Sequence, residues 1–216
     1  CPFFHCALAE GLTSRQRCHR ITIVIHMKAN SVSRSKGHSA TAAAAYRAGG
    51  VIRDHLCGEI HDFSKKSGVL HTEIVGSSLD RDELWNSAEQ AETNKNGSVK
   101  QNARVARELV ISLPYEAGKD QQIEATRNIA KHLNQTYGVA VDFAIHAASK
   151  EGDQRNTHAH LLFTTRTMEG DVLGKKTRVL DDRKTGPEEI EKIRAKYSEI
   201  AQAIAVEPDA WQADSY

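Results

Sequence analysis

Two histidines two residues apart open an apolar segment with the composition of a β-strand. They are His158 and His160, and the residues Leu-Leu-Phe-Thr-Thr follow them. Because side chains alternate between the two faces of a strand, both histidines point to the same face. A third histidine, His146, ends a second apolar run that begins at Val141. The polar residues between the two runs include Gly152, which predicts a loop that joins neighbouring antiparallel strands.

This arrangement brings three imidazoles together without a thiolate or a carboxylate among them. Three neutral imidazoles that leave coordination positions open are typical of a catalytic divalent-metal site and not of a closed structural site. A single strand histidine is usually a surface or core residue without a ligand role. A same-face pair is harder to explain in that way, because packed imidazoles repel each other once protonated. We therefore predict a metal enzyme, with its substrate still open.

Composition narrows the class of protein. The chain has 216 residues, of which 26% are charged and 39% hydrophobic, and its formal net charge is +1. These values are typical of one soluble globular domain, so any nucleic-acid surface must come from local clusters of basic residues. No apolar run is long enough to insert into a membrane. The N-terminal segment lacks the features of a signal peptide and no cysteine pair has CxxC spacing, so we expect reduced thiols and a cytoplasmic location.

The pattern of strands and helices predicts an α+β domain with an antiparallel central sheet flanked by helices. Ser39 is a good N-cap for an alanine-rich helix that Gly49 ends, and this helix places Tyr46 near its C-terminal end. The other expected elements are strands over 21–26, within 105–113, over 141–146 and from 158, helices over 80–91, 116–137 and 187–205, a polar loop over 28–38, and loop with short strand over 51–78.

Tyr46 is the candidate nucleophile for the three-histidine site. A phenol has a pKa of about 10, so it is a poor nucleophile until a metal, a cation or a base assists it. Its position on a helix that follows a strand and a basic loop, with Arg47 next to it, favours this role. Taken alone, Tyr46 is better explained as a half-buried helix residue whose hydroxyl finds a partner.

Four stretches of the chain, in this order, resemble motifs of the MobA/MobL relaxases of mobilisable plasmids, which belong to the HUH endonuclease superfamily. They are 25–47 with Tyr46, 106–114 with Glu108, 144–146 with 156–161 around the histidines, and 173–182 before the closing helix. The resemblance implies the palm-like HUH relaxase fold for residues 21–200. It leaves an irregular N-terminal extension over 1–20 and a tail over 201–216 that is consistent with truncation.

The resemblance also implies a mechanism. Tyr46 would attack one phosphodiester of single-stranded DNA at an origin of transfer, giving a 5′-phosphotyrosyl link and a free 3′-hydroxyl. His146, His158 and His160 would hold one divalent cation, with Mn²⁺ or Mg²⁺ as the working species. Glu108 would act as a base toward the tyrosine or orient a metal-binding histidine, although a glutamate at such a position is often only a solvated charge.

The implied partners are single-stranded or supercoiled plasmid DNA at the origin, accessory mobilisation proteins and a type IV secretion coupling protein, in the bacterial cytoplasm. Basic residues near the motifs are candidates for phosphate contacts, although a solvated face explains most of them individually. The candidates are Arg34, Lys36, Arg47, Arg104, Arg107, Arg166, Lys175, Lys176 and Arg178.

Three alternatives stay open beside the relaxase. A replication initiator of the same superfamily would use the same chemistry, but it places the HxH motif before the tyrosine, and here Tyr46 precedes His158. A catalytically inactive or truncated remnant would bind a DNA hairpin or single strand without cleaving it. An unrelated three-histidine metallohydrolase would activate water and form no covalent adduct with DNA.

Overall fold

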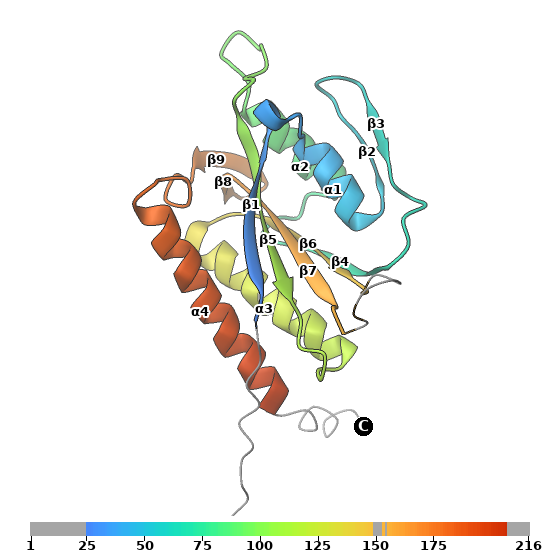
Figure 1. Cartoon of the computed structure of the whole chain (residues 1–216). Helices are drawn as coiled ribbons and strands as arrows, with labels where there is room; N and C mark the ends of the chain where they lie inside the picture. The colour runs from blue at the N-terminus through green and yellow to red at the C-terminus, as the bar shows by residue number, and fades with distance from the viewer. Residues whose placement is uncertain (1–24, 149–152, 154, 207–216) are drawn as a thin grey trace, which may run out of the picture.

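A five-stranded antiparallel sheet forms the centre of the protein (Figure 1). The computed structural model describes residues 25–148, 153 and 155–206. The strands are β1 (Met27–Ser33), β4 (Val69–Val75), β5 (Arg104–Ser112), β6 (Val141–His146) and β7 (His158–Thr164). They lie in the order β1-β5-β7-β6-β4, and every neighbouring pair is antiparallel, which confirms the predicted α+β class.

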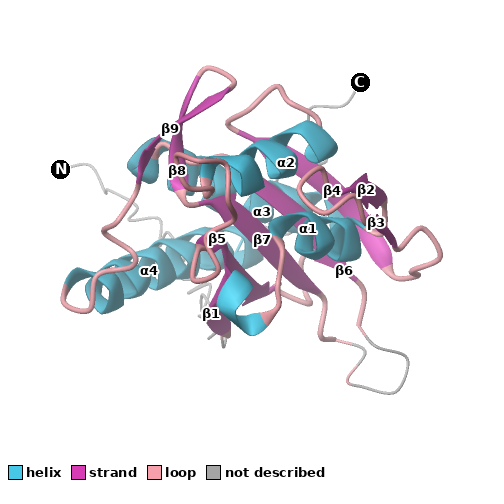
Figure 2. Ribbon diagram, turned by 90° about the horizontal axis from the view of Figure 1, so that it is seen from above, coloured by secondary structure: helices cyan, strands magenta, loops and turns pink. Residues whose placement is uncertain are grey.

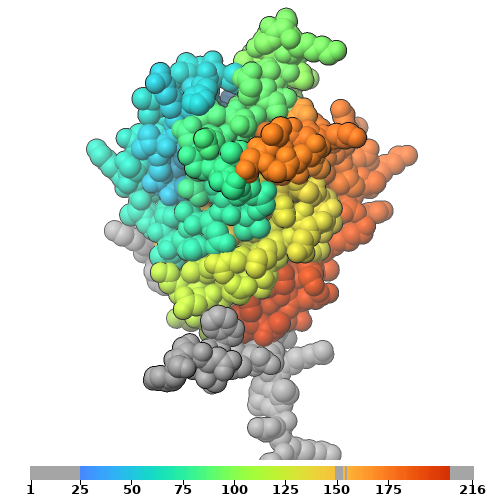
Figure 3. All heavy atoms as spheres, turned by 180° about the vertical axis from the view of Figure 1, so that it is seen from behind, coloured from blue at the N-terminus to red at the C-terminus, as the bar shows by residue number. Residues whose placement is uncertain are grey.

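Helices cover both faces of this sheet, so the domain has three layers (Figure 2). On one face lie α1 (Ala40–Ala48) and α2 (Arg81–Ala91), and on the other α3 (Lys119–Tyr137) and α4 (Thr185–Val206) lie side by side (Figure 3). No helix in the described part of the chain is long and apolar enough to cross a membrane.

The shorter elements are η1 (Arg34–Lys36), the hairpin of β2 (Val51–Arg53) with β3 (Ile60–Asp62), and the hairpin of β8 (Arg166–Glu169) with β9 (Val172–Lys176).

Alternate residues of β7 point into two separate cores. Leu161 and Phe163 pack with α3 and α4, whereas Leu162 packs with α1 and α2. His158 and His160 are an even number of residues from Leu162, so they lie on the sheet face that α1 and α2 cover. The position of α1 on this face brings its C-terminal end toward the histidines.

Local signals define α1, the helix that carries Tyr46. The Ser39 hydroxyl accepts a hydrogen bond from the Ala42 amide over 3.1 Å, which satisfies one of the free N–H groups of the first turn. Gly49 ends the helix with a left-handed φ of 63°, which a glycine adopts without strain. Both ends agree with the prediction, and Tyr46 lies in the last turn.

Among the described residues, the first strand begins just after the segment whose apolar pattern predicted a strand. We expected a strand over 21–26 and a loop over 28–38, but β1 runs from Met27 to Ser33 and η1 follows it directly. Residues 21–24 lie outside the described residues. β1 lies at the edge of the sheet, and Val32 is its one buried residue. A mostly polar sequence can therefore form this strand. That polar composition led to the prediction of a loop.

The structure also corrects one predicted domain boundary and the prediction for one segment. α4 continues to Val206, and Ala201 is fully buried in the core, so the expected domain end at residue 200 falls inside a helix. The stretch 51–78, expected to be loop and short strand, supplies the seven-residue β4 to the central sheet. The predicted extension over 1–20 and the tail beyond residue 206 lie outside the described residues.

A partly buried ion pair between Arg81 and Asp142 joins α2 to the sheet, and its loss should destabilise the protein. Asp142 on β6 accepts two hydrogen bonds from Arg81, each over 2.8 Å, and one from the indole of Trp85 over 2.9 Å. Asp142→Ala leaves the buried indole N–H and the guanidinium without their partner. We therefore expect the free energy of unfolding to fall by about 3 kcal/mol in urea denaturation. A fall of less than about 1 kcal/mol would mean that this ion pair contributes no more than a surface pair does.

Candidate active site

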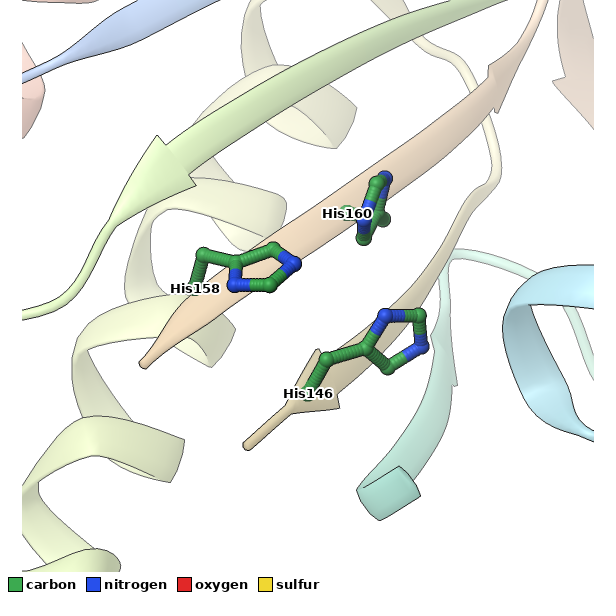
Figure 4. A group of neighbouring side chains, drawn as sticks. All are labelled: His146, His158 and His160. Carbon is green, nitrogen blue, oxygen red and sulfur yellow. The ribbon is translucent and has the colours of Figure 1, made fainter. Parts of the chain in front are cut away.

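The strand register brings the three histidines together, as their spacing predicted. His146 lies directly opposite His158 in the antiparallel pair of β6 and β7, and His160 follows on the same face. One imidazole nitrogen from each ring lies within 4.8 Å of those of the other two rings. The ring centroids are 4.8–5.6 Å apart, and the rings surround a common space (Figure 4).

The second nitrogen of each ring is held by an oxygen acceptor. His146 Nε2 lies 2.7 Å from the main-chain oxygen of Arg47, and His158 Nδ1 lies 3.1 Å from that of Asn156. His160 Nδ1 lies 2.8 Å from a carboxylate oxygen of Glu108. A carbonyl or carboxylate oxygen can only accept, so each of these nitrogens donates a proton and the other nitrogen of a neutral ring keeps its lone pair. This is the usual environment of metal-binding histidines.

Electrostatics favour a neutral His146 ring and an anionic Glu108 carboxylate. Burial lowers the pKa of His146 to about 4, so this imidazole is neutral at neutral pH. Burial alone would raise the pKa of Glu108, but hydrogen bonds from His160 and Arg47 outweigh it and hold that pKa well below its usual range. Three imidazole nitrogen donors, with a carboxylate behind one of them, suit a divalent cation and leave positions for water or substrate oxygen.

Glu108 is positioned to fix the orientation of the His160 ring. It is buried on β5, and besides His160 it accepts hydrogen bonds from Arg47 over 2.5 Å and from Asn30 over 3.2 Å. Of the two roles that the resemblance implied, this geometry supports the orienting one. Asn30 escaped the sequence prediction because it lies in the stretch expected to be a loop, whereas β1 places it directly opposite Glu108.

Loss of the charge on Glu108 should weaken metal binding without removing it. Glu108→Gln keeps the size of the side chain. Its neutral amide oxygen, however, is a weaker acceptor than a carboxylate oxygen for the hydrogen bond from His160 Nδ1. We expect the affinity for Mn²⁺ to fall by about tenfold, within the 10–100-fold range seen for outer partners of metal ligands. Titration calorimetry measures this change, with Glu124→Gln on α3 as the control. An unchanged affinity would show that Glu108 does not support metal binding through His160.

Tyr46 is exposed and lies at the end of α1 nearest to the histidines. The residue is 51% exposed, and the main-chain oxygen of the next residue, Arg47, is hydrogen-bonded to His146. A hydrogen bond therefore joins the helix of the predicted nucleophile to the predicted metal cluster. Sequence analysis did not single out Phe63 and Lys66, which both contact the Tyr46 ring. They lie in the stretch 51–78, where no periodic pattern distinguished them.

Two of the arginines predicted to contact phosphate are enclosed by the fold, which corrects that prediction. The side chain of Arg34 is 9% exposed and pairs with Glu89 at 2.5 Å. The side chain of Arg107 is 6% exposed and pairs with Asp181 at 2.7 Å. A buried guanidinium that is already paired has little surface left for DNA, so both residues instead link parts of the domain that are distant in sequence.

Three further candidates also have partners inside the domain. Arg166 and Lys176, from the β8–β9 hairpin, both pair with Glu92 at the end of α2, at 2.9 and 3.0 Å. Arg47 pairs with Glu108 in the site itself. Lys36, Lys175 and Arg178 are exposed and stay candidates for phosphate contacts, whereas Arg104 is partly exposed and pairs with Asp181. Lys36, Arg47, Arg104 and the largely buried Arg107 line a groove of about 530 Å³ along β1.

Comparison with protein families gives a match over most of the chain. The model of the MobA/MobL family matches residues 38–213. Mobilization protein MobL of Acidithiobacillus ferridurans is 36% identical over 209 residues, which are 83% of this chain and 54% of that protein. The probable mobilization protein MobA of Bifidobacterium longum is 29% identical over 193 residues, or 78% of this chain and 32% of that protein. The chain thus spans about half or less of the length of these relatives.

Solved structures show the same fold. A structure described as the molecular basis of vancomycin resistance transfer in Staphylococcus aureus superposes with a TM-score of 0.71 at 28% identity, covering 90% of this chain and 100% of that one. The metal-bound complex of the conjugative relaxase TrwC with oriT DNA gives a TM-score of 0.50 at 14% identity, covering 85% and 69%. At that identity the second likeness concerns the fold alone. The predicted relaxase architecture is therefore confirmed.

Proposed function

This chain belongs to the MobA/MobL family, and from that premise we propose that it nicks and rejoins one DNA strand at an origin of transfer to start plasmid mobilisation. One observation carries the proposal. The three histidines converge with their second nitrogens held by oxygen acceptors, and one of those acceptors belongs to Arg47, next to Tyr46. The histidine cluster and an exposed phenol thus lie at the same end of α1, which supports nucleophilic attack on a phosphodiester beside a bound cation.

The proposed reaction balances without a further reactant. The Tyr46 oxygen forms a bond to the scissile phosphorus and its proton passes to water, while the bond from phosphorus to the 3′ oxygen breaks. The 3′ oxygen keeps the electron pair and takes up a proton from water. One DNA fragment therefore ends in a free 3′-hydroxyl, and the other stays on the protein as a 5′-phosphotyrosyl ester. Attack by a 3′-hydroxyl on this ester reverses the changes and rejoins the strand.

The donor set of the histidine cluster fits one divalent cation, held by His146, His158 and His160, with Mn²⁺ or Mg²⁺ as the proposed species. The bound cation would polarise a non-bridging phosphate oxygen and stabilise the charge that develops in the transition state. Glu108 and the main-chain oxygen of Arg47 keep two of the rings in orientation. Plasmid DNA, accessory mobilisation proteins and a coupling protein in the bacterial cytoplasm are the partners and the setting that this function requires.

A covalent-adduct assay tests the proposal. Single-stranded oligonucleotides from candidate origins, labelled at either end, are incubated with the protein in Mn²⁺ or in EDTA and separated on a denaturing gel. We expect a metal-dependent adduct with the 3′-labelled fragment and a released 5′-labelled fragment that a polymerase extends. Diffusible fragments without an adduct would instead indicate a metallohydrolase. Binding without cleavage of a validated origin would favour the alternative function, a binding-only remnant.

A further inference from the structure

The turn from Phe63 to Lys66 packs against the C-terminal end of α1. The Phe63 amide donates to the main-chain oxygen of Gly50 over 2.9 Å, and the Lys66 amide closes the turn on the Phe63 oxygen over 2.9 Å. The Phe63 ring meets the ring of Tyr46 edge-on, with centroids 5.2 Å apart. The turn therefore gives the exposed Tyr46 ring a fixed wall on one side.

Lys66 contacts Tyr46 twice. Its Nζ donates to the main-chain oxygen of Tyr46 over 2.7 Å and lies 3.8 Å from the centroid of the Tyr46 ring. The first contact satisfies a carbonyl of the last helical turn, where a cation is favoured. The second places a positive charge on the face of the aromatic ring, which attracts cations. This attraction grows when the phenol loses its proton, because the ring system then carries a full negative charge.

The same segment also reaches the histidine cluster. Two residues after Lys66, the main-chain oxygen of Gly68 accepts the amide of Ala147 over 2.8 Å, and Val69 then pairs with His146. Lys66 thus lies on the short connection between β3 and β4, and β4 pairs with the strand that ends at His146. A residue with only a capping role would not need to lie over the ring or on this connection.

We propose that Lys66 is a positioning residue for the nucleophile, one that fixes the Tyr46 ring against Phe63 and stabilises the charge that develops on the phenol oxygen as it attacks. This inference rests on the proposed function and adds a residue to it. The partial burial of Lys66 strengthens the interaction, because a desolvated ammonium group interacts more strongly with an aromatic face than a hydrated one does.

Single-turnover nicking at saturating DNA tests this role in three variants. Lys66→Met removes the charge and keeps the length of the side chain, Lys66→Arg keeps the charge, and Lys65→Met is the matched control at the exposed neighbour. We expect a loss of about tenfold in the nicking rate for Lys66→Met, with DNA affinity by fluorescence anisotropy unchanged. Lys66→Arg should recover most of the rate, and Lys65→Met should behave as wild type. Equal rates for Lys66→Met and wild type, or a loss of affinity without a loss of rate, would overturn the proposal.

A second measurement does not depend on activity. In protein labelled with 3-fluorotyrosine, the ¹⁹F resonance of Tyr46 is the one that Tyr46→Phe removes. This resonance should shift in Lys66→Met and stay in place in Lys65→Met, whether or not the wild type nicks DNA. If the wild type forms no adduct but the resonance shifts, the proposed function fails while the contact stands. If the resonance stays in place in Lys66→Met, the role of Lys66 is refuted. This outcome can be read even if Lys66→Met is too unstable for kinetics, with Lys66→Arg as the folded reference that keeps the charge.

Discussion

Tyr46→Phe should abolish the covalent protein–DNA adduct, with a fall in the nicking rate of at least about 10⁴-fold. The substitution removes only the phenol oxygen, the atom that we propose attacks the phosphorus. The ring stays in place with its contacts to Phe63 and Lys66. Tyr46 is 51% exposed, so the loss of its hydroxyl should have little effect on stability. DNA affinity should stay within about twofold of wild type by fluorescence anisotropy, because one hydroxyl is lost and every basic side chain is kept.

Tyr115→Phe is the matched control for this prediction. Tyr115 is 59% exposed, slightly more than Tyr46, but it lies in the loop between β5 and α3 and not on α1. Exposure alone does not make a tyrosine a nucleophile, so Tyr115→Phe should form the adduct at the wild-type rate. An adduct that survives in Tyr46→Phe and is lost in Tyr115→Phe would place the chemistry elsewhere in the protein.

His160→Ala should lower the affinity for Mn²⁺ by more than the 10–100-fold expected for an outer partner such as Glu108, and it should stop nicking. His160 is the one histidine of the three that a carboxylate holds, and its removal leaves two nitrogen ligands and separates Glu108 from the metal site. EDTA should have the same effect on the wild-type protein. Calorimetry with Mn²⁺ and the adduct assay measure the two effects separately.

His71→Ala is the control for the metal prediction. His71 lies on β4 of the same sheet but pairs with Glu73 and is no member of the histidine cluster. Its loss should leave metal affinity and nicking unchanged. If EDTA left adduct formation intact in the wild type, or if His160→Ala bound Mn²⁺ as tightly as wild type, the three histidines would have no role as a metal centre.

The histidine cluster could be predicted because the period of a strand is a local property. His158 and His160 share a face in any extended strand, and the polar segment after His146 allowed a return to a neighbouring strand. The edge strand β1 could not be predicted in the same way. Its residues are mostly polar, so the strand was predicted at the apolar run just before it.

The roles of the basic residues could not be read from the sequence, because their partners are distant in it. Arg34 pairs with Glu89 and Arg107 with Asp181, more than fifty residues away in each case. Nothing local distinguishes an arginine that forms such a buried pair from one that faces DNA. Lys66 was missed for a related reason, since its contact with Tyr46 depends on how the turn after β3 packs against the end of α1.

Identification of the residue that carries the DNA tests the central claim most directly. After reaction and nuclease treatment, trypsin should release the peptide Gly37–Arg47, in which Tyr46 is the only tyrosine. The account predicts a nucleotide on this peptide in mass spectra of the Mn²⁺ reaction and its absence in EDTA. A nucleotide on another peptide, such as the one that contains Tyr115, or cleaved DNA with no modified peptide at all, would contradict it.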